Sequence, residues 1–164
     1  MKSILKGLTF LLPIFTIACD NIPQTGMIKD ITSHITTNYT NIKPEEVFIY
    51  MNEERCNHNQ IPLGHEFQLV NNKIKGLKVK DGKVSVGGSM KISDKKGKVL
   101  LEIKDLFGEN NVFEKDSVTF LRATISTGSP MEYDNLYDVT INYWDNYGTG
   151  TLENKMEIEI IDLP

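Results

Sequence analysis

The run Tyr137-Asp138-Val139-Thr140-Ile141-Asn142-Tyr143 decides the fold, because apolar and polar side chains alternate along it without a break. Successive side chains of a β-strand point to opposite faces of the sheet, so the run predicts a strand with one buried face and one face in water. The run Met156-Glu157-Ile158-Glu159-Ile160 repeats the pattern. These two runs are the clearest strand signals in the chain.

The period of two extends over most of the chain from Glu46 onward. Further alternating runs occupy residues 47–51, 67–69, 74–79, 84–92, 99–103 and 121–125. Turn signals such as Asp81-Gly82 and Asp94-Lys95-Lys96-Gly97 separate them. About seven or eight such strands predict an all-β domain, an antiparallel immunoglobulin-like β-sandwich, over residues 46–164. Without the cysteine pair of antibody domains, burial alone must hold its core.

Residues 19–45 show little pattern and are rich in Asn, Thr and Ile. They predict a tether between the N-terminal segment and the sandwich. Ile28, Ile31 and Ile35 have a partial helical spacing, so a short helix is the alternative.

The first nineteen residues carry a targeting signal. Lys2 and Lys6 precede an apolar run at residues 8–18, which is too short to span a bilayer as a helix, since about 20 apolar residues are needed. A positive start, an apolar segment and a small residue before the cut are typical of a secretory signal. The run ends in Thr16-Ile17-Ala18-Cys19, which matches the bacterial lipobox, with Thr16 where leucine is commonest.

Residues 1 to about 20 therefore resemble the precursors of bacterial lipoproteins. The resemblance implies that residues 1–18 are a signal peptide and that Cys19 receives a diacylglycerol thioether. Acyl chains such as palmitate on Cys19 would anchor the protein to a bilayer of the cell envelope, on the periplasmic or cell-surface side. More than one chain would make the anchoring stable. An ordinary secreted protein, with Cys19 merely near the cut, is the alternative.

A second resemblance covers residues 60–162 and rests on turn and core positions. Its segments include Lys75-Gly76-Leu77, Asp105-Leu106-Phe107, Thr127-Gly128-Ser129-Pro130 and Trp144-Asp145. Their order is similar to that in small, uncharacterised envelope lipoproteins of gut-anaerobe type. The resemblance implies one β-sandwich behind the lipobox and brings no activity with it.

The charge of the chain argues against nucleic acid as a partner. Counted from Cys19 on, the formal charge is 16 − 22 = −6, because the signal holds two of the 18 basic residues and none of the 22 acidic ones. The lysines between Lys73 and Lys98 are interleaved with apolar residues and turns, which predicts solvent faces of strands instead of a basic stripe. The same dispersion predicts no electrostatic binding to anionic lipid and leaves the acyl group as the membrane contact.

Two aromatic residues are candidates for ligand or partner contact. Tyr137 and Tyr143 share the buried phase of their strand, so core packing is their expected role. Trp144 falls on the opposite phase and Tyr147 lies in a glycine-containing loop. Together they could offer an exposed platform for a sugar ring or a protein partner. Packing on a second face is the alternative for Trp144.

Three carboxylates near strand ends are candidate calcium ligands, because carboxylate and carbonyl oxygens suit that ion. They are Asp94, Asp105 and Asp145. A simple turn is the alternative for Asp-Lys-Lys-Gly, where Asp accepts backbone hydrogen bonds and Gly takes a positive φ. The histidines show no zinc-ligand spacing. They are His34, His58 and His65.

No nucleophile with a base, and no pair of acids, can be assigned from the sequence. Cys56 lacks a disulfide partner if Cys19 is lipidated, and His58 two residues on shares a face with it only by accident of local geometry, so an incidental thiol is expected. The sequence therefore predicts a non-enzymatic, membrane-anchored envelope protein without cofactor, a protein-interaction or accessory module. A carbohydrate-binding module is the alternative, and a calcium-binding sandwich is the third possibility. The expected partner is another envelope protein or a glycan.

Overall fold

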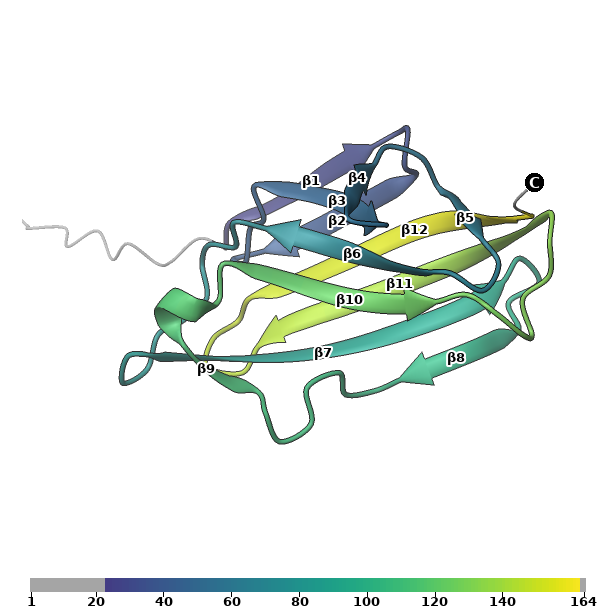
Figure 1. Cartoon of the computed structure of the whole chain (residues 1–164). Coiled ribbons are helices and arrows are strands. Elements are labelled where there is room, and N and C mark those ends of the chain that lie inside the picture. The colour runs from purple at the N-terminus through teal and green to yellow at the C-terminus, as the bar shows by residue number, and fades with distance from the viewer. Residues whose placement is uncertain (1–22, 163–164) are drawn as a thin grey trace, which may run out of the picture.

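Two β-sheets pack face to face in the computed structural model, which describes residues 23–162 (Figure 1). The strands β3, β6 and β10 lie in front of β12, β11 and β7 in this view. All strand pairs are antiparallel except one, between β5 and β12. The prediction of an all-β antiparallel sandwich is therefore confirmed, while an immunoglobulin-like connectivity stays a prediction.

The large sheet has six strands in one continuous order and two short additions. The continuous order is β1 (Thr25–Asp30), β2 (Ile35–Thr40), β12 (Thr151–Ile161), β11 (Asn135–Asp145), β7 (Lys83–Asp94) and β8 (Val99–Ile103). The additions are β5 (Gln60–Pro62), which pairs with β12, and β9 (Val112–Glu114), which pairs with β7. A single 3-10 turn, η1 (Lys115–Ser117), follows β9.

The small sheet has four strands. Their order is β10 (Phe120–Ser126), β6 (Glu66–Asn72), β3 (Glu46–Met51) and β4 (Glu54–Cys56). The described residues thus form twelve strands, more than the seven or eight that the sequence predicts. Several of the additional strands are only three residues long, which is too short for a recognisable alternation.

The core lies between the sheets, and β11 illustrates how alternation builds it. Tyr137, Val139, Ile141 and Tyr143 are all at most 4% exposed, whereas the residues between them are half-buried on the outer face. On the facing sheet, β6 contributes Phe67 among its inward residues. Burial of these apolar side chains is the main favourable term in folding, at about 25 cal/mol for each Å² removed from water.

The tether predicted for residues 19–45 is wrong for its larger part, as is the alternative of a short helix. β1 and β2 form a hairpin, and β2 pairs with β12. Ile35 and Thr37 of β2 are buried, and the Thr37 hydroxyl donates a hydrogen bond of 2.8 Å to Asn154 Oδ1 on β12. The sequence does not show an alternation of apolar and polar residues along β2, because the inward Thr37 is polar.

The strand predicted at residues 74–79 is also wrong. This segment is a loop that contributes a single isolated bridge, Lys43 to Lys75. Ile74 and Leu77 still pack against the core, which explains their apolar character without a strand ladder. No helix of residues 23–162 is long and apolar enough to cross a membrane. Residues 1–18 and Cys19, the predicted signal and lipidation site, lie outside the described residues.

Two substitutions on β11 test the register. Ile141 is 0% exposed, so Ile141→Ala should lower the free energy of unfolding by about 2–5 kcal/mol through lost burial and a residual cavity. Thr140 is on the outer face, and Thr140→Ala should cost less than about 1 kcal/mol. Urea denaturation of the chain from Cys19 onward measures both, and equal costs would contradict the register.

Candidate functional site

The outer face of the large sheet carries rows of polar side chains. Four of its strands contribute to each row, because β2, β12, β11 and β7 are neighbours. One row of Cα partners consists of Asn38, Glu153, Asn142 and Ser89. The next row consists of Thr36, Lys155, Thr140 and Lys91, and continues to Glu102 on β8. The face thus presents amide, hydroxyl, ammonium and carboxylate groups side by side.

Trp144 lies in the neighbouring row, beyond Asn142 along β11, and over Gly87 of β7. The two residues are Cα partners, and a Cβ atom added at Gly87 would fall 2.2 Å from indole atoms Cε2 and Nε1. Only glycine therefore leaves room for the ring. The indole is half-buried, and among the described residues its N–H has no hydrogen-bond acceptor. One side of the indole is held against the sheet, and the other is available to a ligand.

A shallow hollow of about 590 Å³ extends from Trp144 over the neighbouring strands. Asn142, Thr140 and Lys91 are among its lining residues. A second hollow, of about 410 Å³, shares Lys91, Thr140 and Lys155 with the first and continues toward Asp138. We call the two together the trough. Its length along β11, from residue 138 to residue 144, is about 20 Å at 3.3 Å per residue.

Ion pairs occupy part of the trough and leave its centre free. Lys155 Nζ lies 2.9 Å from Glu153 Oε1, and this hydrogen bond holds the pKa of Glu153 below its usual value. Lys91 is exposed and makes no ion pair with any residue of 23–162. A ligand in the middle of the trough would therefore meet an unpaired ammonium group beside the Thr140 hydroxyl.

A charged cluster lies at the end of the trough away from Trp144. Lys95 Nζ lies 2.6 Å from Asp138 Oδ1 and 2.7 Å from Glu157 Oε2, and His34 Nδ1 lies 3.3 Å from Glu157 Oε1. Hydrogen bonds to Asp138 and Glu157 raise the pKa of Lys95, and the bond from Lys95 lowers the pKa of Glu157. These groups compensate one another on the surface, where such pairs add little stability.

Tyr147 does not share the trough with Trp144, although the sequence predicts a joint platform. It lies in the turn between β11 and β12, where its N–H donates a 2.9 Å hydrogen bond to Asp145 Oδ1. Lys80 Nζ lies 5.8 Å from the centre of its ring. Of the two predicted contact residues, only Trp144 lines the trough.

The three predicted calcium ligands do not meet. Asp94 ends β7, whereas Asp145 pairs with Val86 near the start of the same strand, so the two lie toward opposite ends of the sandwich. Asp105 follows β8 and lies in a separate loop. No group of three potential metal-ligating side chains occurs in the described part of the chain. These three carboxylates therefore do not come together as ligands of one calcium ion.

All three carboxylates instead accept backbone N–H bonds, as Asp does in turns. The donors are Lys96 and Lys98 to Asp94, Phe107 and Gly108 to Asp105, and Lys78 and Tyr147 to Asp145. The bonds to Asp94 agree with the alternative of a simple turn.

Cys56 is half-buried at the end of β4, and burial raises the pKa of its thiol. A catalytic cysteine needs a lowered pKa, so the environment of Cys56 disfavours the thiolate. His58 is exposed in the following loop, and no hydrogen bond joins it to Cys56.

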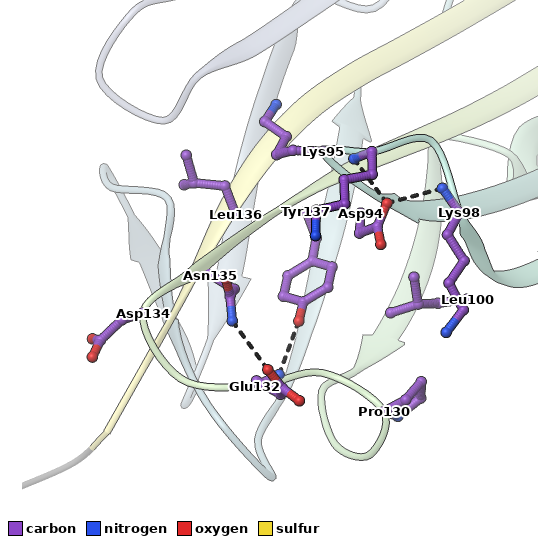
Figure 2. Close-up of a pocket in the computed structure, with 11 residues that line it drawn as sticks. Asp94, Lys95, Lys98, Leu100, Pro130, Glu132, Asp134, Asn135, Leu136 and Tyr137 are labelled. Carbon is purple, nitrogen blue, oxygen red and sulfur yellow. Dashed lines mark hydrogen bonds between the residues drawn. The ribbon is translucent and has the colours of Figure 1, made fainter.

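Figure 2 shows another hollow, of about 440 Å³, between the turn at residues 94–98 and the segment at residues 130–137. Tyr137 is the buried polar side chain among its lining residues, and its hydroxyl accepts a 2.9 Å hydrogen bond from the Glu132 N–H. The Asp94 carboxylate is occupied within its own turn. The Tyr137 hydroxyl and the Asp94 carboxylate are thus each engaged within one of the two turns that flank this hollow.

The outer face of the small sheet is a second surface, which the sequence analysis missed. Both arginines of the sequence lie on it: the Arg55 guanidinium is 4.5 Å from the ring centre of Phe48, and the Arg122 guanidinium is 5.4 Å from that of Phe120. Tyr50 on the same face is 38% exposed. We call these five residues the arginine–aromatic face. The available signal for this face was the aromatic residues that alternate with buried residues along β3 and β10. The sequence does not show that β10, β6 and β3 are neighbours in one sheet.

A scan against models of known protein families finds no match to this chain, and a search of curated proteins finds none either. The function is therefore inferred from the geometry.

Gly87→Ala tests the packing of the Trp144 indole against β7. The new methyl group would overlap the indole ring, so the ring should be displaced toward solvent. Because Trp144 is the one tryptophan of the sequence, its emission should shift to longer wavelength and acrylamide quenching should increase. Ser89→Ala, on the same strand and face, is the matched control and should leave the emission unchanged.

Proposed function

We propose that this chain is a lipid-anchored, non-enzymatic module of the bacterial cell envelope that binds a glycan in the trough of its large sheet. The observation that carries the proposal is the Trp144 indole, held over Gly87 at one end of the trough, with its other side available next to the polar rows. An aromatic ring of this kind offers an apolar surface to the C–H groups of a sugar ring.

The polar residues of the trough suit sugar hydroxyl groups, which both donate and accept hydrogen bonds. Asn142 supplies an amide, Thr140 a hydroxyl, and Lys91 an unpaired ammonium group. The trough is open and extends along β11, which suits an oligosaccharide better than a compact small molecule. A glycan, with many hydroxyl groups and alternating apolar ring faces, matches this combination.

The ion-paired Glu153 carboxylate of the trough supports a binding role instead of hydrolysis. Glycoside hydrolysis commonly uses two carboxyl groups, one of which has a raised pKa so that it can donate a proton. The pKa of Glu153 is instead lowered by Lys155, and Asn38 donates a further hydrogen bond of 3.2 Å to its carboxylate.

A protein partner is the second candidate, and the arginine–aromatic face favours it. Protein interfaces are enriched in Arg and aromatic residues and depleted in Lys. On this face, the outward positions of β3, β6 and β10 contain no lysine in the described structure, although the chain from Cys19 on contains fourteen. Arg122 makes no ion pair within residues 23–162 and is free to meet a carboxylate of a partner.

Titration with soluble neutral, amino and acidic oligosaccharides tests the glycan proposal. A bound sugar should change the Trp144 fluorescence in a saturable way. By calorimetry, Trp144→Ala should weaken binding at least about tenfold, and Asn142→Ala should weaken it about two- to tenfold through a lost hydrogen bond. Arg122→Ala is the control on the opposite face and should leave sugar affinity unchanged. An indole protected from acrylamide, or equal affinity in Trp144→Ala, would contradict the proposal.

The anchor is tested separately. The match of Thr16-Ile17-Ala18-Cys19 to the lipobox supports lipidation of Cys19. Cys19→Ala should abolish labelling by a fatty-acid probe and leave the protein soluble or uncut. Cys56→Ala is the matched control, since it removes the other thiol of the sequence. Recovery of the Cys19→Ala protein in the membrane fraction at the wild-type level would overturn the assignment.

A further inference from the structure

The fold gathers lysines at one end of the sandwich that are far apart in the sequence. They lie in the connections 41–45 and 73–82, at the start of β7, and in η1 beside the turn 146–150 between β11 and β12. In Figure 1 this is the end at which β7 and β12 start and β6 and β11 finish. We call it the basic end. Its lysines, all exposed, are Lys43, Lys73, Lys75, Lys78, Lys80, Lys83 and Lys115.

Backbone hydrogen bonds hold these segments together. Lys43 and Lys75 exchange two bonds of 2.9 Å, and Lys80 and Lys83 exchange bonds of 2.8 and 3.0 Å. The N–H of Lys115 donates to the carbonyl of Gly82 at 3.1 Å. The lysines are therefore placed by ordered backbone and form one surface.

The basic end has the opposite charge to the rest of the protein. Its seven lysines accompany six carboxylates, a net charge of +1, so the remainder of the chain from Cys19 on carries −6 − 1 = −7. The six carboxylates belong to Glu45, Glu46, Asp81, Glu114, Asp116 and Asp145. Asp145 is buried, and Glu45 and Glu114 are paired with lysines. Four lysines of this end make no ion pair within residues 23–162: Lys43, Lys78, Lys80 and Lys115.

The chain enters the sandwich at this same end. Gln24 and Asn41 are joined by two hydrogen bonds, of 2.8 and 2.9 Å, and Gln24 lines a hollow together with Lys43 and Lys75. Gln24 is five positions after Cys19, so the two Cα atoms are at most about 18 Å apart. A lipid on Cys19 would hold the basic end, and no other part of the sandwich, close to the bilayer.

We infer that the basic end rests on the anionic headgroups of the membrane that holds the anchor, as a second membrane contact beside the lipid. This rests on the proposed lipidation of Cys19. Each lysine near an anionic surface adds an attraction equivalent to about fivefold in the contact equilibrium. The attraction acts within a Debye length of about 10 Å, which a short link allows and a long tether would not. Tyr147, beside Lys80, supplies a residue type that is enriched at the membrane–water interface.

The basic end would thus add to the acyl group, although the dispersion of lysines in the sequence predicts that the acyl group is the whole membrane contact. Loops that are dispersed in the sequence converge at one end of a sandwich. The expectation also placed these lysines on strand faces, whereas Lys73, Lys75, Lys78 and Lys80 lie in the connection between β6 and β7. At the other end, three lysines and three carboxylates line the hollow of Figure 2: Lys95, Lys96 and Lys98 with Asp94, Glu132 and Asp134.

Hydrogen exchange on vesicles tests the contact with the anchor supplied chemically. The chain from Cys19 to Pro164, with Cys56→Ser, contains every described residue and can be coupled through Cys19 to a maleimide lipid. One set of vesicles is pure phosphatidylcholine, and the other contains about one part in three of phosphatidylglycerol. Backbone amides at residues 41–45, 73–83 and 146–150 should exchange more slowly on the anionic vesicles only. The difference should vanish at about 0.5 M salt, where screening is strong.

Charge-reversal variants identify the surface. The triple variant Lys43→Glu, Lys78→Glu, Lys80→Glu should lose the protection, because the equilibrium constant for contact should fall at least about fivefold for each lysine reversed. Its melting temperature shows whether it is folded. Lys96→Glu, Lys98→Glu at the opposite end is the matched control and should retain the protection.

The inference would be overturned by equal protection on neutral vesicles, by protection at residues 94–98 instead, or by equal loss of protection in the control variant. Protection of the same amides by soluble polyphosphate, as strong as that on vesicles, would assign the basic end to a soluble polyanion and also overturn it. Because the coupling is chemical and no sugar is present, these results are independent of fatty-acid labelling of Cys19 and of the glycan titration.

Discussion

The pairing of β11 with β12 on one side and β7 on the other determines what each surface of this protein presents. Ten residues of β11 are in register with β12, and nine are in register with β7. A slip of one residue would turn every side chain of β11 to the opposite face, which would bury Trp144 and expose Ile141. The apolar phase of β11 makes that slip costly. Core and trough are therefore two consequences of one register.

Long, strictly alternating strands could be predicted from the sequence, because burial of one face leaves an uninterrupted signal, as in β11 and β12. β1 and β2 could not, since the inward Thr37 is polar and stable only with Asn154 as its partner, more than a hundred residues away. Both members of the buried Thr37–Asn154 pair are polar, so neither β2 nor β12 shows by its own sequence that this position is buried. The strand predicted at residues 74–79 is wrong for the opposite reason, since apolar residues of a loop can pack on a core without pairing in a sheet.

The outward position of Trp144 could be predicted from its phase on β11, but its contact with β7 could not. The indole needs Gly87, which lies more than fifty residues earlier, and the two meet only because β7 is the neighbour of β11. The same adjacency brings Lys91 beside Thr140. Strand neighbours in a sandwich are set by the connection pattern, which period and composition do not specify. The arginine–aromatic face was missed for this reason too, although each aromatic on it alternates with a buried residue.

The orientation implied by the basic end has a consequence for both binding surfaces. The basic end contains the starts or finishes of the long strands, so contact there would make β7, β11 and β12 rise from the membrane (Figure 1). The trough and the arginine–aromatic face would then stand on opposite sides of an upright sandwich, and the bilayer would cover neither. Trp144 would lie at the end of the trough nearer the membrane, because it precedes the 146–150 turn. A glycan stacked on it would therefore be held near the headgroups, while a protein could occupy the other sheet at the same time.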